Sequence, residues 1–459
     1  MSAQKSAPKT FSDTAVQRYV RRMVVPVISR WRTGPKRVVR EWAADFGRRL
    51  SRQPHQLHFF YDASDPYSHL AALLVPRLER AYRLQLNVAL VPPPDDAHAP
   101  ERKRLTDWSV RDVRDIAPFY GLKVGTWRAP PPRPQQRLAQ RALVAAGEKA
   151  AADLADISID LWGGRTRALS ARPQAAVRAT EEALAAGGAL RTRWGHYSGA
   201  MFYYGGTWYW GLDRLSYLTA RLDWHQLRRA GAPPALPRVP HTPRLPKRSR
   251  RAKPAGKASA PPFTLECFVS LRSPYSYIAL PELLALARHY PLRLRARPVL
   301  PMVMRGLPVP PTKGVYILED VAREALTNGV PFGRVQDPVG TPVRRGMSLF
   351  PFADAQGRGM EWLHAFCYAA WARARYMGDE KNLRAAASSI GLAWNEAREH
   401  LDQPGWEAVA ERNQKALFEL GLWGVPSFRL SNQRNQTLYS GFGRDRIWRI
   451  RSILAGGRS

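Results

Sequence analysis

The chain has 459 residues, of which 45% are hydrophobic and 10% aromatic, so most of it can form packed domains, and its length predicts two or three of them. Its formal net charge is +34, which favours an anionic partner such as nucleic acid or an anionic membrane surface, although a soluble enzyme rich in arginine accounts for the charge equally well. Its two cysteines, Cys267 and Cys367, form no C-x-x-C pair, which excludes a dithiol redox centre and a cysteine zinc site.

No apolar run approaches the ~20 residues that span a bilayer. The best run near the N-terminus, Met23 to Ile28, is shorter than the roughly 7–15 residues of a signal-peptide core. We therefore expect a cytoplasmic protein, and the charge leaves attachment to the periphery of a membrane open as an alternative.

Residues 1–50 are predicted to form a basic N-terminal arm. Apolar residues recur in it at helical spacing, and Pro26 and Gly34-Pro35 interrupt the pattern. Such an arm packs on its own protein or lies on an anionic membrane. The basic residues of the arm from position 18 onward are Arg18, Arg21, Arg22, Arg30, Arg32, Lys36, Arg37, Arg40, Arg48 and Arg49.

An internal repeat organises the rest of the chain. Residues 57–68 (LHFFYDASDPYS) and 265–276 (LECFVSLRSPYS) each predict a short apolar strand, a Pro-Tyr-Ser turn and a helix, 208 residues apart. Two further matches follow in the same order. Trp108, Asp112 and Asp115 correspond to Tyr316, Asp320 and Arg323, and the segments 194–198, 202–204 and 211–215 correspond to 423–428, 437–439 and 443–447.

The repeat predicts two α/β domains, at 51–227 and 263–459, joined by a basic, Pro-rich linker at 228–262. Each domain is expected to run strand, helix and strand, then a helical stretch, then a hairpin and a final helix. In the second domain the helical stretch includes Gly359 to Arg375 and Asp379 to Ile390, and in the first the aromatic residues between Phe202 and Trp210 form the core of the hairpin. The positive charges of 1–50 and 228–257 are candidate contacts for an anionic partner.

The order of these motifs resembles the DsbA-like thioredoxin superfamily. Within it the chain is most similar to the 2-hydroxychromene-2-carboxylate isomerases and kappa-class glutathione transferases, over residues 263–455 and more weakly over 55–225. The resemblance implies an α/β fold with two tandem thioredoxin-like domains, each with an inserted helical subdomain.

Ser273 is the candidate catalytic residue. It precedes Pro274 at the start of a helix, where unpaired backbone N–H groups favour an anion. The resemblance implies that its hydroxyl holds the thiolate of bound glutathione. The alternative is that Ser273 only caps the helix.

Four further residues resemble the glutathione-binding positions of the family. Val425-Pro426 resembles its cis-proline site, where the backbone of the first residue pairs with glutathione, and an ordinary turn proline is the alternative. Arg444 and Asp445 resemble the segment that holds the γ-glutamyl end, with Asp445 accepting from the ammonium and Arg444 and backbone N–H groups meeting the carboxylate. Arg444 departs from the smaller polar residue expected there, and Asp445 as a helix cap is the alternative.

The substrate site resembles that of the isomerases less closely. Arg305 could replace the family's lysine, and Tyr275 of the S-P-Y-S turn is a second candidate substrate contact. No asparagine follows near Arg305, which argues against assuming the chromene substrate. The next helix, which contains Lys313, is expected to pack rather than to react.

The first domain departs further from the family. Asp65 stands where the second domain has Ser273, and a carboxylate there would repel a thiolate. Tyr197 stands in place of the proline. We interpret this domain as a degenerate copy that supports, covers or dimerises with the second, within one chain or between two.

The sequence therefore predicts a glutathione-dependent isomerase of the cis-trans type, or a glutathione transferase, that acts on an electrophilic and aromatic-derived small molecule. The alternative is a thioredoxin-fold scaffold without catalytic activity that binds nucleic acid or anionic membrane through its basic segments. A disulfide oxidoreductase is a third reading, and it is disfavoured because neither Pro-Tyr-Ser turn carries a cysteine.

Overall fold

The computed structural model describes residues 34–236 and 261–456. They fall into two compact units, 37–236 and 261–456, which are described one at a time below. Most of the predicted basic arm and most of the predicted linker lie outside the described residues. No helix in the described ranges combines the length and the apolar character needed to cross a membrane.

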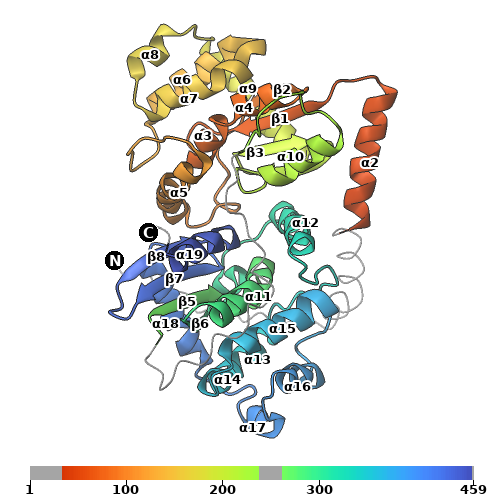
Figure 1. The fold of residues 1–459 in the computed structure, drawn as a ribbon, viewed down its shortest axis with the longest axis vertical. Helices are drawn as coiled ribbons and strands as arrows, with labels where there is room; N and C mark the ends of the chain where they lie inside the picture. The colour runs from red at the N-terminus through yellow and green to blue at the C-terminus, as the bar shows by residue number, and fades with distance from the viewer. Residues whose placement is uncertain (1–33, 237–260, 457–459) are drawn as a thin grey trace. The chain divides into compact units, whose positions relative to one another are not determined.

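The first unit is built around a four-stranded sheet with the strand order β2-β1-β3-β4 (Figure 1). Strand β1 (Gln56–Tyr61) is parallel to β2 (Gln85–Leu90) and antiparallel to β3 (Met201–Tyr204), which forms a hairpin with β4 (Thr207–Trp210). Helices precede, connect and follow the strands: α2 (Pro35–Leu50), α3 (Pro66–Ala72), α4 (Val75–Ala81), α5 (Arg102–Ile116), α6 (Arg133–Ala146), α7 (Ala150–Trp162), α8 (Thr166–Ala171), α9 (Val177–Arg193) and α10 (Leu215–Trp224).

Aromatic side chains fill the centre of this sheet. Phe59 of β1 stacks on Phe202 of β3 with ring centroids 4.5 Å apart, and both rings are fully buried. The predicted hairpin core is confirmed, because Tyr204, Trp208 and Tyr209 are buried as well. The aromatic run of the sequence thus stabilises the fold of this unit.

The second unit has a sheet of the same order, β6-β5-β7-β8. Strand β5 (Phe263–Val269) is parallel to β6 (Leu292–Pro298) and antiparallel to β7 (Ser427–Asn432), which pairs with β8 (Thr437–Phe442). Its helices are α11 (Pro274–His289), α12 (Pro311–Thr327), α13 (Thr341–Ser348), α14 (Phe350–Ala355), α15 (Gly359–Arg373), α16 (Glu380–Ser389), α17 (Trp394–Glu399), α18 (Trp406–Glu419) and α19 (Ile447–Leu454).

The two units therefore share one topology, with helices inserted between the second and third strands of each sheet. The predicted α/β class is confirmed, and the helices expected at 359–375 and 379–390 are α15 and α16. A local contact is repeated too. The hydroxyl of Ser68 accepts from the Asp62 N–H at 3.2 Å, and the hydroxyl of Ser276 accepts from the Ser270 N–H at 3.3 Å.

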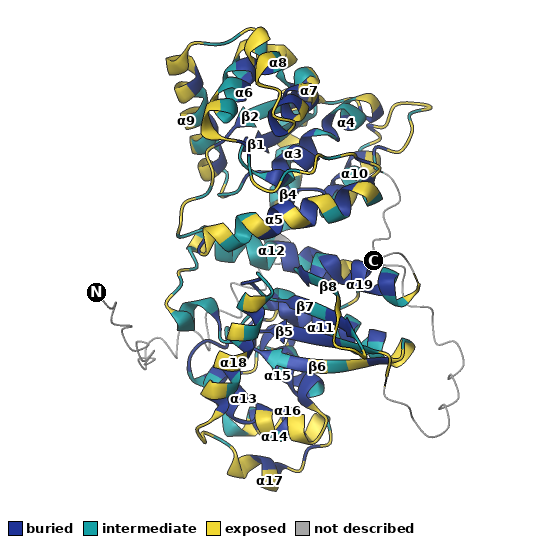
Figure 2. Ribbon diagram, turned by 90° about the vertical axis from the view of Figure 1, so that its left-hand side faces the viewer, coloured by how far each residue is buried: buried dark blue, intermediate teal, exposed yellow. Residues whose placement is uncertain are grey.

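The core of the second unit lies where the inserted helices meet the sheet. Helix α15 contributes the fully buried Trp362 and Phe366, and the dark blue segments of Figure 2 follow α11, α15 and β5. This core fixes the end of β5 and the start of α11, and the segment between them contains Ser273.

Candidate active site

Ser273 caps helix α11, immediately after strand β5. Its backbone is extended, and its Oγ accepts a hydrogen bond from the Ser276 N–H at 3.1 Å. The capping role considered from the sequence is therefore present. It uses one acceptor position of the hydroxyl, which has a second acceptor position and one donor.

The structure brings Ser273 next to Val425, which is 152 residues away in the sequence. The Val425–Pro426 peptide bond is cis, as the resemblance predicts. The Ser273 hydroxyl donates toward the Val425 carbonyl oxygen at 3.5 Å, which is a long and therefore weak hydrogen bond. Two of the predicted site residues thus meet at the start of α11, and the donor of the hydroxyl is only weakly engaged there.

Tyr275 anchors the turn to helix α12. Its hydroxyl donates to Asp320 at 2.6 Å, and the buried Asp320 is paired with Arg323. The first unit repeats this bond, since Tyr67 donates to Asp112 of α5 at 2.6 Å. The correspondence between Asp112 and Asp320 proposed from the sequence is confirmed. Tyr275 has a structural partner, and its predicted contact with substrate stays a prediction.

Arg444 does not occupy the position expected of a ligand contact. Its guanidinium is buried and bonds Glu324 of α12 at 2.6 Å and Glu282 of α11 at 3.3 Å. Burial raises the pKa of Glu282, and Arg444 counteracts that rise. The geometry argues against the predicted contact between the Arg444 side chain and a glutathione carboxylate, because the guanidinium already satisfies two carboxylates of the protein.

Asp445 follows Arg444 in the 3₁₀ segment Arg444–Arg446 and is half-buried. The neighbouring Arg446 is buried, and its Nη1 donates to the Asp445 carbonyl oxygen at 3.1 Å. The first unit again repeats the contact, from Arg214 to the carbonyl oxygen of Asp213 at 3.3 Å. The Gly-x-Asp-Arg motif therefore has a folding role in both units, and binding by Asp445 stays a prediction.

Two cationic side chains, Arg305 and Lys313, are candidates for binding an anionic substrate. Arg305 ends the 3₁₀ segment Met302–Arg305 between β6 and α12 and is half-buried. Lys313, which the sequence reasoning assigned to packing, lies in the first turn of α12, and its Nζ is 5.9 Å from the centre of the Trp423 ring. Burial lowers the pKa of Lys313 to about 8. The sequence does contain a signal that Lys313 is unusual, because the helix dipole makes a positively charged side chain unfavourable in the first turn of a helix.

The corresponding position of the first unit carries two acids, the buried Asp62 and the half-buried Asp65. Asp65 caps α3 by accepting from the Tyr67 and Ser68 N–H groups, both at 3.1 Å. Burial and the nearby Asp62 raise the pKa of Asp65 to about 7. The sequence predicts that a carboxylate here would repel a thiolate, and a carboxyl group with this pKa is only partly ionised at neutral pH.

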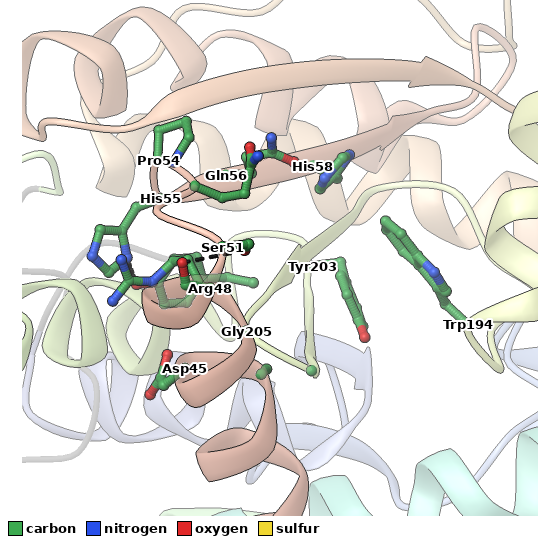
Figure 3. Close-up of a pocket in the computed structure, with 14 residues that line it drawn as sticks. Asp45, Arg48, Ser51, Pro54, His55, Gln56, His58, Trp194, Tyr203 and Gly205 are labelled. Carbon is green, nitrogen blue, oxygen red and sulfur yellow. Dashed lines mark hydrogen bonds between the residues drawn. The ribbon is translucent and has the colours of Figure 1, made fainter.

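Two cavities of the described residues lie away from Ser273. One, of about 470 Å³, is in the first unit between α2, the start of β1 and the β3–β4 hairpin (Figure 3). The other, of about 1330 Å³, is in the second unit, and its walls include Glu266 with Arg295, Arg297 and Arg429. Neither cavity is lined by Ser273, Val425 or Asp445.

Comparison with protein families assigns the second unit. Residues 264–455 match the model of the DSBA-like thioredoxin domain. The assignment holds for residues 264–455 alone, which form a DsbA-like thioredoxin domain. The first unit matches no family model. Its similarity to the second unit rests on the shared strand order and on the repeated contacts described above.

Several solved structures are similar to parts of the chain. A 2-hydroxychromene-2-carboxylate isomerase is 20% identical over 42% of this chain and 95% of its own, with a TM-score of 0.36. A probable DsbA oxidoreductase from Streptomyces coelicolor is 20% identical (43% and 92%, TM-score 0.33), and the cytosolic disulfide reductase DsbM from Pseudomonas aeruginosa, solved with GSH, is 22% identical (38% and 89%, TM-score 0.31). At these values none of the three carries an argument about reaction or substrate. A search of curated proteins found no match.

The DsbA-like domain carries no thiol at its turn. Cys267 and Cys367 are both buried in the core, and burial raises the pKa of each. The two Sγ atoms face the carbonyl oxygens of Leu265 and Leu271 at 3.7 Å. Buried thiols of raised pKa are poor nucleophiles, so neither cysteine is placed for disulfide exchange.

Proposed function

We propose that the second unit is a glutathione-dependent isomerase or transferase in which Ser273 holds the glutathione thiolate. The observation that carries the proposal is the meeting of the Ser273 hydroxyl with the carbonyl group of Val425, beside the cis Val425–Pro426 bond and at the N-terminus of α11. The match of residues 264–455 to the DsbA-like domain supports it. Glutathione itself enters from the resemblance of three motifs to the family: S-P-Y-S at 273–276, G-V-P-S-F at 424–428 and G-x-D-R at 443–446.

The donor set at Ser273 fits a thiolate. Capping engages the hydroxyl as an acceptor from the Ser276 N–H, so its hydrogen remains available for donation. Rotation of that hydrogen away from the Val425 carbonyl oxygen would lose only a weak hydrogen bond of 3.5 Å. The N-terminus of the 16-residue helix α11 adds a partial positive charge at the same point. Ser273 would therefore stabilise the anion of a bound thiol rather than act as a nucleophile itself.

Glutathione, when bound, would supply a thiolate that adds to an electrophilic carbon and then leaves after bond rotation in an isomerase, or stays attached in a transferase. The protein's part is to keep that sulfur ionised and to orient the other reactant. Lys313 and Arg305 are the cations that would attract an anionic group of the substrate. Lys313 would do so in its charged form, which its lowered pKa of about 8 still favours at pH 7.

Glutathione binding is tested by thermal unfolding of the full chain. Glutathione at 100 times its dissociation constant should stabilise the folded state by about 2.7 kcal/mol and raise the melting temperature. Turnover is then followed as isomerisation of 2-hydroxychromene-2-carboxylate and as conjugation of glutathione to an activated aryl halide. Absence of any thermal shift in wild-type protein at millimolar glutathione would overturn the proposal.

Two variants of Ser273 separate its proposed chemistry from its capping. Ser273→Ala removes the hydroxyl and costs about 1 kcal/mol of stability, whereas glycine at a helix cap costs only a few tenths. We expect Ser273→Gly to unfold close to the wild-type temperature and to lose turnover as severely as Ser273→Ala. Wild-type turnover in Ser273→Gly would remove the hydroxyl from the mechanism. Clear insulin-reducing activity of the wild-type chain would instead indicate a disulfide oxidoreductase.

A further inference from the structure

Helix α2 exposes its apolar face, whereas an ordinary surface helix buries it. The side chains on its exposed stripe recur every three or four residues, as one face of a helix does, and almost all are apolar or small. Trp42 is 64% exposed and stacks on Phe46, which is 54% exposed, with ring centroids 5.2 Å apart. The stripe is completed by Val38, Val39, Ala43, Gly47, Arg49 and Leu50.

Polar contacts hold the opposite face of α2 against the first unit. Glu41 accepts from the Thr207 hydroxyl at 2.9 Å and lies 3.7 Å from Arg221 of α10. Asp45 lies 3.8 Å from Arg221 and 3.4 Å from His225. These contacts, above all the ion pairs with Arg221, hold this face of α2 against the first unit, and the aromatic pair on the opposite face points outward.

The cavity of about 470 Å³ lies behind this inner face (Figure 3). Its walls include Asp45 and Arg48 of α2, with Arg48 beside His55 in the view, and the aromatic side chains of Trp194 and Tyr203. The inner face of α2 is therefore polar and incompletely packed. The stability of the helix in this position does not come from burial of its own apolar residues, which remain available for another surface.

The charge around the stripe is positive. The acidic residues of α2, Glu41 and Asp45, are engaged with Arg221 and His225, while Arg49 is exposed on the stripe itself. Helix α2 itself carries Lys36, Arg37, Arg40, Arg48 and Arg49 against these two acids, and the sequence of residues 1–33 adds seven lysines and arginines and one aspartate. An apolar stripe with cationic flanks is complementary to an anionic bilayer surface.

From this arrangement we infer that α2 is an in-plane membrane anchor that inserts Trp42, Phe46 and Leu50 into the interface of an anionic lipid bilayer. The proposal is independent of the reaction catalysed by the second unit. Its ligand is the lipid surface: acyl chains for the apolar stripe and anionic headgroups for the basic residues of α2, such as the exposed Arg49.

A second copy of the chain fits the stripe less well. Helix α2 has 16 residues and is about 24 Å long, so a stripe about 10 Å wide offers about 240 Å². A stable protein interface takes about 800 Å² from each partner. Pairing two copies would also bring the basic residues of both α2 helices together, and like charges repel.

The experiment is flotation of the full chain with vesicles of phosphatidylcholine containing 30% phosphatidylserine, beside vesicles of phosphatidylcholine alone. We expect binding to the anionic vesicles that weakens about tenfold or more in a Trp42→Ser/Phe46→Ser variant. The matched control is Val177→Ser/Leu326→Ser, which removes two equally exposed apolar side chains from other helices and should bind as wild type does. Both variants should unfold at nearly the wild-type temperature, because all four side chains are exposed.

Three results would overturn the inference. The first is no flotation of the wild-type chain with anionic vesicles. The second is equal flotation of wild type and Trp42→Ser/Phe46→Ser, which would mean that charge alone binds the vesicles, as it would bind nucleic acid. The third is a dimer in light scattering that the same variant converts to monomer, which would assign the stripe to a second copy.

Discussion

We expect the acid pair of Asp62 and Asp65 in the first unit to make the stability of this protein depend on pH, and Asp65→Asn tests the contribution of Asp65. Asp65 has a pKa of about 7 in the folded chain, against about 3.9 for an unperturbed aspartate. Between these two pH values the folded state holds a proton that the unfolded state has lost. The contribution of Asp65 to stability is therefore fully present below about pH 4 and is lost as the pH rises to about 7.

The size of the effect follows from the shift. One proton changes the free energy of unfolding by at most about 1.4 kcal/mol per pH unit, so three units would give about 4 kcal/mol. Asp65 is partly exposed, and solvent reduces the shift, so we expect a loss of about 2 kcal/mol between pH 4.5 and pH 7. Asparagine cannot ionise and is still a good helix cap, so Asp65→Asn should lack this loss while retaining α3.

The assay is urea unfolding of wild type and Asp65→Asn at half-unit steps from pH 4.5 to pH 8. Other groups titrate in the same range, including His55, whose pKa burial and Arg48 lower to about 4. Groups that do not interact with Asp65 contribute equally to both proteins and cancel in the difference between the two curves, whereas Asp62 interacts with Asp65 and its response is part of that difference. The difference should favour Asp65→Asn increasingly up to pH 7 and then level off. Parallel curves would show that Asp65 ionises normally, and the reasoning from burial and from Asp62 would be wrong.

Three further predictions concern the second unit and the packing of the first. Ser273→Cys should give a thiol with a pKa below 8.5, because the helix terminus favours a thiolate; the pH dependence of alkylation measures it without interference from the two buried cysteines, and a pKa of 8.5 or more would contradict it. Glu324→Gln should lower the free energy of unfolding by about 3 kcal/mol by weakening the buried pair with Arg444, and a loss below about 1 kcal/mol would mean that the pair is replaceable. Gly187→Ala should cost about 2 kcal/mol or more, since a Cβ there would lie 2.0 Å from the Leu90 carbonyl oxygen, and a wild-type melting temperature would show that α9 can move away from β2.

Much of the fold could be predicted from the sequence because the signals are local. The strands, turn and helix around Ser273 follow from apolar runs and from Ser-Pro, and the internal repeat predicts the correspondence of Asp112 with Asp320, which the two tyrosine contacts confirm. The candidate active site was harder to predict from the sequence. The approach of Ser273 to Val425 could be expected only from the resemblance, since no local rule joins residues 152 positions apart.

Other features depended on three-dimensional contacts that the sequence does not reveal. Arg444 was expected to face a ligand, but Glu282 and Glu324, on two other helices, bind its guanidinium instead. Helical spacing identified an amphipathic arm, but it could not show that ion pairs with Arg221 would turn the apolar stripe of α2 outward. In both cases long-range charge pairing, rather than local propensity, determined where the side chains point.

The buried pair of Arg444 and Glu324 has a counterpart inside the same chain. By the motif correspondence, the first unit carries Leu212 and Ile116 at these two positions, and both are buried. The same topology is thus formed once with two charges and once with two hydrocarbons, and apolar replacement of a buried ion pair often leaves a fold as stable or more so. The first unit therefore serves as an internal comparison for the second. Contacts that both units share belong to the common fold, and a feature of the second unit alone, such as this ion pair, is not required to form that fold.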